Sequence, residues 1–163
     1  VSELLEKDMV LKQDNSKPQI LLFHTHSKEA FADSKSGKKE DTIVGVGNYL
    51  EELLTEKYGY NVIHDKTTYD SVRDRAYSVA LPAVKKILEE NPTIEVVIDL
   101  HRDGVGANGA KRLTTIDGKP TAQIMFFNGL SRNHNGPIAY LDNPNLEGNL
   151  AFSLQMQLKA MSL

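Results

Sequence analysis

Two apolar runs that each end at a histidine constrain the fold of this chain most strongly. Residues 19–24 read QILLFH and residues 94–101 read IEVVIDLH. The first run is apolar without alternation, as in a strand buried on both faces of a parallel sheet. A third run, YNVIH at 60–64, has a similar form. The pattern therefore predicts at least three short, buried strands.

Segments of helical length connect these predicted strands. Residues 42–58 and 70–91 place apolar side chains at the spacing of one helix face. Parallel strands need crossovers of about this length. A fourth strand is predicted over 122–127, and a last helix runs from residue 143 to the C-terminus. The order of elements predicts an α/β fold with a mainly parallel central sheet and helices on both faces.

Proline, asparagine and glycine positions predict where elements bend and end. Pro82 lies inside the second helical segment and predicts a kink or a break. Asn143 and Pro144 are typical of the N-cap and first residue of a helix. Residues 103–119 hold four glycines, which predicts a loop or loose hairpin.

The composition is that of one globular domain, predicted over residues 1–163 with an N-terminal arm over 1–18. Apolar residues make up 40% and charged residues 25%, as is usual for a folded domain. A formal charge of −3 gives no reason to expect a nucleic-acid partner. No apolar run is close to the about 20 residues that a membrane-spanning helix needs. The chain starts at valine without a signal peptide, so an anchor is expected to lie, if present, outside this sequence.

Histidines at strand ends carry the predicted chemistry. Three of the five histidines, His24, His26 and His101, follow the predicted strands directly, and the chain has no cysteine. The carboxyl ends of parallel strands meet at one edge of a sheet, so these imidazoles can converge there. Nitrogen and oxygen ligands without sulfur favour a catalytic zinc with an open coordination position.

A carboxylate normally completes a zinc site that has two histidines. Glu40, just before the helix at 42–58, is the first candidate, and Glu29 is the second. Glu29 is equally placed to act as a general base. His24 and His26 are two residues apart and are expected to face the same way. One then ligates the metal while the other supports it through a hydrogen bond.

The residues beside His101 suggest further roles. Asp99 or Asp103 is placed to orient an imidazole through its second nitrogen. Arg102 is placed to bind a carboxylate of the substrate, which makes it a candidate catalytic residue. His64 ends a strand without a comparable loop after it and is expected to be structural.

A long polar loop over 128–145 is the predicted substrate-binding segment. Arg132 and Asn133 offer hydrogen bonds suited to a sugar–peptide substrate, and His134 is expected at the surface or in contact with substrate. No phosphate-binding glycine loop, G-x-S-x-G motif or H-E-x-x-H motif is present.

Three strings together resemble the stage II sporulation protein P family: HTHSKEAF, EDTIVGVGNYLEELLTEKYGYNVIHDKT and IEVVIDLHRDGV. That family comprises cell-wall hydrolases of endospore-forming bacteria, related to zinc-dependent N-acetylmuramoyl-L-alanine amidases. The resemblance runs from about residue 19 to the end. It implies the zinc amidase fold, which is phosphorylase/hydrolase-like, with Zn²⁺ as cofactor and peptidoglycan as substrate. It also implies cleavage of the amide between N-acetylmuramic acid and L-alanine, with endopeptidase activity on stem peptides as an addition.

The resemblance also implies residue roles and a cellular setting. The first zinc histidine corresponds to His26 rather than His24, the zinc glutamate to Glu40 and the second zinc histidine to His101. Family members act with stage II sporulation protein D, a lytic transglycosylase, during engulfment of the forespore. The implied location is extracytoplasmic and wall-facing, with a membrane anchor in the full-length protein.

One departure from the family pattern leaves a second function open. The family has a further glutamate in a C-terminal strand of the form L-I-E-x-G, whereas this sequence stops at Leu163 after a predicted helix. The domain is therefore expected to be truncated at its C-terminus. The alternative function is a non-catalytic peptidoglycan-binding or scaffold module, and a cytosolic zinc or manganese hydrolase of small amides is a third.

Overall fold

The structure, a computed structural model, describes residues 1–12, 14–104, 109 and 112–162. Its contacts divide the chain into two compact units. The first, Leu11–Gly104, is called the sheet unit below. The second, called the terminal unit, combines Val1–Val10 with Val105–Leu163. The prediction of a single domain over residues 1–163 stays a prediction.

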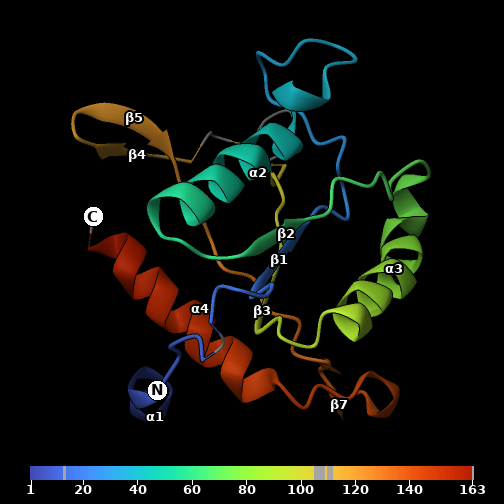
Figure 1. The fold of residues 1–163 in the computed structure, drawn as a ribbon, viewed down its shortest axis with the longest axis vertical. Helices are drawn as coiled ribbons and strands as arrows, with labels where there is room; N and C mark the ends of the chain where they lie inside the picture. The colour runs from blue at the N-terminus through green and yellow to red at the C-terminus, as the bar shows by residue number, and fades with distance from the viewer. Residues whose placement is uncertain (13, 105–108, 110–111, 163) are drawn as a thin grey trace. The chain divides into compact units, whose positions relative to one another are not determined.

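A three-stranded parallel sheet forms the centre of the sheet unit (Figure 1). Its strands are β1 (Ile20–Phe23), β2 (Val62–His64) and β3 (Val96–Asp99), in the order β2-β1-β3. All four residues of β1 are buried, because this strand has a neighbour on each edge and a helix on each face. The predicted mixed α/β class and the three parallel strands are thus confirmed.

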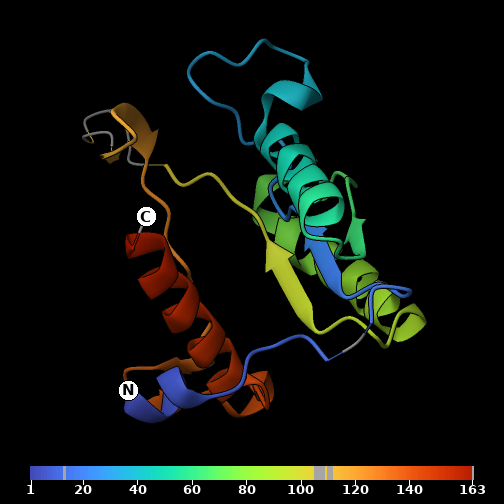
Figure 2. The same cartoon turned by 60° about the vertical axis from the view of Figure 1, so that its left-hand side comes forward.

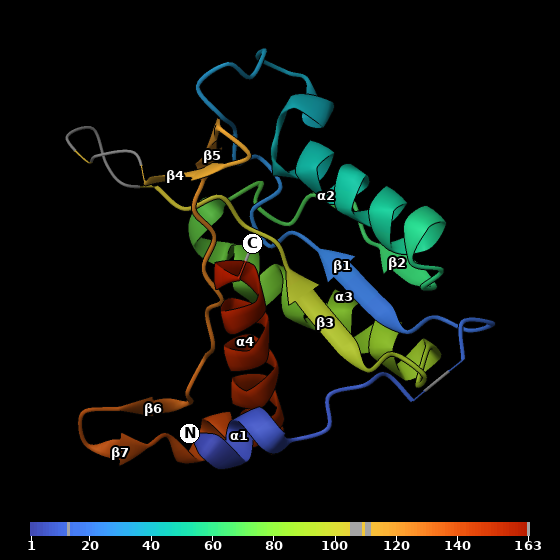
Figure 3. The same ribbon diagram turned by 90° about the vertical axis from the view of Figure 1, so that its left-hand side faces the viewer.

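Two helical crossovers cover the two faces of this sheet (Figures 1 and 3). The first comprises η1 (Lys39–Asp41), α2 (Ile43–Glu52) and a π-helical turn, η2 (Leu53–Lys57); the second comprises η3 (Arg73–Arg75) and α3 (Ala76–Glu90). Leu21 and Phe23 alternate with Leu22 along β1 and join a core with Ala80 of α3. Thr42 caps α2, since its side chain accepts a hydrogen bond from the backbone N–H of Val44.

Helix α3 continues through Pro82 without a break. Proline removes one backbone donor, which frees the carbonyl of Ser78 four residues earlier. Both Ser78 and Pro82 are exposed, so water can solvate that carbonyl. The predicted break at Pro82 is therefore wrong.

The terminal unit pairs the two ends of the chain. Its elements are α1 (Ser2–Glu6), β4 (Leu113–Ile116), β5 (Lys119–Ala122), β6 (Arg132–Asn133), β7 (Gly136–Pro137), η4 (Ala139–Leu141) and α4 (Leu146–Met161). Helices α1 and α4 lie side by side (Figure 2). The Gln155 side-chain amide donates to the carbonyls of Leu4 and Lys7 at 3.0 and 2.9 Å.

The predicted strand over 122–127 is wrong. The strand pair here is the antiparallel hairpin β4–β5, and residues 123–127 carry no strand. Asp117 and Gly118 both have positive φ, 51° and 74°, as a two-residue hairpin turn requires. Pairing with the nearest segment therefore replaces addition to the parallel sheet. The last helix also starts later than predicted, with Asn145 rather than Asn143 at its N-cap.

Among the residues that the structure describes, no helix is long and apolar enough to cross a lipid bilayer.

Candidate functional site

The carboxyl ends of β1 and β3 bring His26 and His101 together. Phe23 pairs with Asp99 in the sheet register, and the backbone N–H of Leu100 donates to the Phe23 carbonyl at 3.0 Å. Both strands therefore end at the same edge of the sheet. The ring centroids of His26 and His101 lie 5.5 Å apart, with the ring planes at 61°. The convergence expected of neighbouring parallel strands is therefore present.

Asp99 fixes the orientation of His101. One carboxylate oxygen, Oδ2, lies 2.9 Å from His101 Nε2. Thr25 holds the same carboxylate through its backbone N–H, at 2.8 Å from Oδ1, and through its hydroxyl. The bond to Asp99 raises the pKa of His101 above its ordinary value, although burial opposes this. Of the two predicted orienting residues, Asp99 takes this role, whereas Asp103 accepts a bond from Gly104.

Glu29 is a buried carboxylate beside the two histidines. Its Oε2 lies 3.6 Å from His101 Nδ1 and accepts the backbone N–H of Arg102 at 2.7 Å. Its Oε1 accepts from the Arg73 guanidinium at 3.3 Å. The two donors hold this carboxylate close to His101. His26, Glu29 and His101 are called the strand-edge cluster from here on.

His26 has a buried nitrogen without a partner. Its Nδ1 makes no hydrogen bond to any described residue, although the side chain is only 7% exposed. An unsatisfied buried polar atom costs about 1–3 kcal/mol, and such atoms commonly face a water or an ion. His26 Nδ1 is therefore available to a ligand.

Sequence reasoning missed two residues at this site. Tyr77, at the start of α3, places its ring centroid 5.3 Å from that of His26 and 6.3 Å from that of His101. Arg73, on η3, contacts Glu29. Both residues lie at the beginning of the second crossover, which starts at the carboxyl edge of the parallel sheet. Their position at the start of a helix that follows a strand is the sequence signal that could have placed them at this site.

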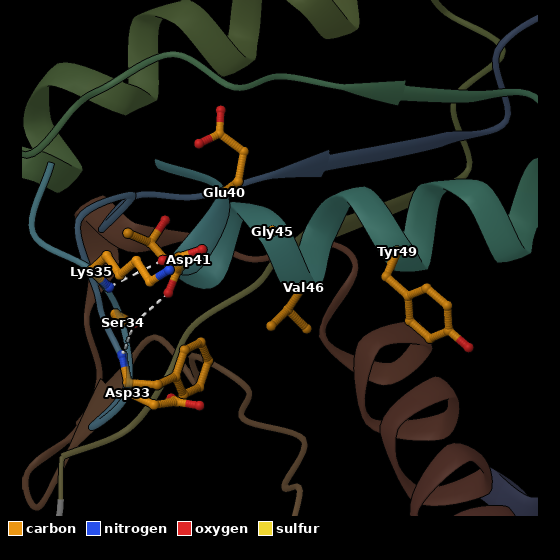
Figure 4. A pocket seen from close by; sticks show the side chains of 10 residues that line it. Asp33, Ser34, Lys35, Glu40, Asp41, Gly45, Val46 and Tyr49 are labelled. Carbon is orange, nitrogen blue, oxygen red and sulfur yellow. Dashed lines mark hydrogen bonds between the residues drawn. The ribbon is translucent and has the colours of Figure 1, made fainter. Parts of the chain in front are cut away.

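Glu40 stands apart from the strand-edge cluster. It lies on η1 and is exposed, and its side chain points to the opposite side of α2 from Val46 and Tyr49 (Figure 4). In the part of the chain that the structure describes, no three histidine, cysteine, aspartate or glutamate side chains are grouped for metal binding. Ligation by His26, Glu40 and His101 stays a prediction.

His24 is fully buried, and its ring contacts Leu100 and His64 rather than a ligand position. Its Nδ1 contacts the Leu100 carbonyl at 2.9 Å, and its Nε2 lies 2.8 Å from His64 Nε2. His24 and His26 were expected to face the same way, but the chain turns after His24 instead of continuing as a strand. Because both ring nitrogens of His24 are engaged, His26 is the better metal-ligand candidate of the two.

The buried contacts of His24 continue to the surface through His64. His64 Nδ1 lies 2.9 Å from Glu51 Oε2, which also pairs with Lys66 at 3.0 Å. His64 thus has structural contacts, in line with its predicted role. The Leu100–His24, His24–His64 and His64–Glu51 contacts each need one hydrogen atom to be a hydrogen bond. Two neutral imidazoles carry only two N–H groups, so all three bonds form only when one ring is protonated. Burial lowers the pKa of both His24 and His64, so a third proton enters only at acid pH.

The predicted substrate-binding residues belong to the terminal unit. Arg132 and Asn133 form β6, both are exposed, and His134 follows them in the turn to β7. Their role in substrate binding stays a prediction.

Fold and cluster together define the class: an α/β protein with a histidine–carboxylate centre at the carboxyl edge of a parallel sheet. The model of the stage II sporulation protein P family matches residues 2–162. The chain therefore belongs to the stage II sporulation protein P family, which confirms the resemblance at the level of family.

A curated relative agrees with this assignment. The chain is 25% identical over 143 residues to "Stage II sporulation protein P" of Bacillus subtilis (strain 168). The match covers 78% of this chain and 35% of the relative, so the chain spans about a third of that protein's length. No solved structure matches the chain significantly.

Proposed function

We propose that this chain is part of a peptidoglycan hydrolase that cleaves the amide between N-acetylmuramic acid and L-alanine during engulfment in sporulation. Membership of the stage II sporulation protein P family supports the setting. The observation that carries the proposal is the strand-edge cluster, in which two imidazoles 5.5 Å apart adjoin a buried carboxylate. Amide hydrolysis needs such a centre to activate water and to protonate the leaving amine.

The cluster suits zinc as its cofactor. Imidazole nitrogens and carboxylate oxygens are common zinc ligands. The buried Nδ1 of His26 makes no hydrogen bond to a described residue, so it is free to coordinate a metal ion. The Asp99–His101 contact is the usual outer support of a zinc histidine. We assign His26 and His101 as ligands; Glu40 stands apart from them in this structure, so it would have to move to become the third. A zinc ion there would polarise the scissile carbonyl and lower the pKa of a bound water.

Three further residues are assigned to ring orientation, proton transfer and substrate binding. Asp99 holds the His101 ring in one orientation. Glu29, fixed by Arg102 and Arg73, is assigned as the general base that takes a proton from water and passes it to the leaving amine. Arg102, whose backbone N–H donates to Glu29, is assigned to a carboxylate of the stem peptide.

The setting that the family implies is also proposed for this chain. A peptidoglycan substrate places the active protein outside the cytoplasm and facing the wall, with an anchor outside this sequence. Stage II sporulation protein D, as a lytic transglycosylase, would cut the glycan while this chain removes stem peptides.

Product analysis tests the proposed reaction. Purified protein supplied with Zn²⁺ is incubated with purified peptidoglycan, and soluble products are identified by mass spectrometry. We expect peptides that begin with L-alanine, and at least a hundredfold less of them from Glu29→Gln, since a positioned general base contributes about 10²–10⁴-fold.

Two other results would contradict the proposal. New reducing sugar ends without free L-alanine amines would indicate cleavage of the glycan instead. Sedimentation with peptidoglycan without any released product would favour the non-catalytic binding module.

A further inference from the structure

The two histidines assigned as zinc ligands differ in what holds their rings. The ring of His101 is fixed by the Asp99 carboxylate, whose Oδ2 lies 2.9 Å from His101 Nε2. Neither ring nitrogen of His26 is hydrogen-bonded to a described residue, and its Nδ1 is buried. A metal-ligating histidine almost always has a hydrogen-bond partner at its second nitrogen. Another kind of contact must therefore hold the His26 ring in place.

Tyr77 packs edge to face against the His26 ring. The two ring centroids lie 5.3 Å apart, and the ring planes meet at 86°. Aromatic pairs prefer this T-shaped arrangement, with centroids about 4.5–7 Å apart. The same tyrosine ring lies 6.3 Å from that of His101, with the two planes only 26° from parallel. Tyr77 therefore contacts both candidate ligands and constrains how the two imidazoles face each other.

Helix α3 fixes the position of Tyr77, although this residue is itself 63% exposed. Ala76 and Ala80 on the same turns of the helix are buried, and Ala80 belongs to the core that includes β1. Arg73, four residues before Tyr77, contacts the Glu29 carboxylate. Side chains four residues apart lie on the same side of a helix. The start of the second crossover therefore brings both Arg73 and Tyr77 to the strand-edge cluster.

We propose that Tyr77 is a positioning residue of the strand-edge cluster, whose ring holds the His26 imidazole by edge-to-face packing. This packing takes the place of the hydrogen-bond partner that His101 has in Asp99. It also leaves both nitrogens of His26 without a competing partner, so no hydrogen bond is lost when a ligand binds. A ring that is held in one orientation beforehand lowers the ordering cost of coordination. The inference rests on the proposed function for the identity of the ligand, whereas the orientation of the ring does not depend on it.

NMR of the metal-free protein tests the orientation of the ring. The measurement is the nuclear Overhauser effect between the ring protons of His26 and His101, whose ring centroids lie 5.5 Å apart. We expect this cross-peak in the parent and in Tyr77→Phe, because phenylalanine keeps the aromatic ring. We expect its loss in Tyr77→Ala, because the His26 side chain is then free to sample other rotamers. Since Tyr77 is largely exposed, the alanine variant should keep the fold.

Zinc affinity tests whether this orientation serves a ligand. An aromatic contact is worth about 0.5–1.5 kcal/mol, which is about a two- to twelvefold change in a dissociation constant. Competition with a chromophoric chelator should show zinc binding weakened by about this factor in Tyr77→Ala and unchanged in Tyr77→Phe. Tyr49→Ala is the matched control and should also leave zinc binding unchanged. Tyr49 lies on α2 (Figure 4), is 63% exposed like Tyr77 and has no ring contact with a described histidine.

The outcomes separate this inference from the proposed function. A cross-peak as strong in Tyr77→Ala as in the parent would overturn the inference, and so would equal weakening of zinc binding by Tyr77→Ala and Tyr49→Ala. Tyr77→Phe that behaves like Tyr77→Ala would overturn it too, since the hydroxyl rather than the packed ring would then act. A parent protein that binds no zinc would contradict the proposed function, while the cross-peaks would still decide whether Tyr77 positions His26.

Discussion

Asp99 is the residue that ties the two strand ends of the candidate site together. It ends β3, accepts two hydrogen bonds from Thr25 after β1 and contacts His101. Burial raises the pKa of the Asp99 carboxyl, but the bonds to His101 and Thr25 outweigh this and leave its pKa low. The fold therefore favours the charged form of each partner, which lowers the pKa of Asp99 and raises that of His101 from their ordinary values.

Asp99→Asn should lower the pKa of His101 in metal-free protein. The Asp99 contact is the main cause that raises the His101 pKa above 6.5. A raised histidine pKa stabilises the fold fully below pH 6.5, and this contribution is lost as pH rises through the raised value. The test is an NMR titration of the His101 ring in the presence of a chelator, for parent and variant.

The control for that titration is the His134 ring signal, which should be the same in both proteins. An unchanged His101 midpoint in Asp99→Asn would show that Asp99 does not set its charge. The stability difference between parent and variant should also shrink as pH rises from 6.5 through the raised pKa of His101.

Helix α2 depends on glycine where it crosses the end of β1. A Cβ added at Gly47 would lie 2.7 Å from Nε2 of both His24 and His64. These two rings belong to the buried contacts between Leu100 and Glu51. The backbone of α2 can therefore lie this close to the two imidazoles only because residue 47 has no side chain.

Gly47→Ala should destabilise the protein by about 1–3 kcal/mol, the usual cost of forcing extra volume into a packed interior. Gly148→Ala in α4 is the control, because nothing lies within 4 Å of an added Cβ there. Alanine is the better helix former, so this control should be neutral or stabilise by up to about 1 kcal/mol. Urea denaturation measures both, and a neutral Gly47→Ala would contradict the described packing.

Sequence patterns predicted these elements well where burial decides the structure. The apolar run of β1 and the helical spacing of α2 and α3 reflect a sheet covered on both faces. The segment 122–127 has a similar apolar run, but the turn at Asp117 and Gly118 pairs its neighbours locally. Helix α3 tolerates Pro82 because its freed carbonyl is on the exposed side.

At the scale of the whole molecule, strand order decides which predicted site residues meet. His26 and His101 meet because β1 and β3 are neighbours, as the strand-end pattern suggested. Glu29 joins them because the Arg102 backbone N–H and the Arg73 guanidinium both donate to its carboxylate. Tyr77 and Arg73 lie about 50 residues from His26 in sequence, so no local pattern could connect them to it.

Zinc content is the measurement that tests the central claim most directly. Parent, His26→Ala, His101→Ala and the control His134→Ala are loaded with Zn²⁺, dialysed and analysed by elemental analysis. A single catalytic site predicts about one zinc per chain in the parent and the control, and loss of most of it in the other two variants. No retained zinc in the parent, or full retention in either strand-edge variant, would contradict the account.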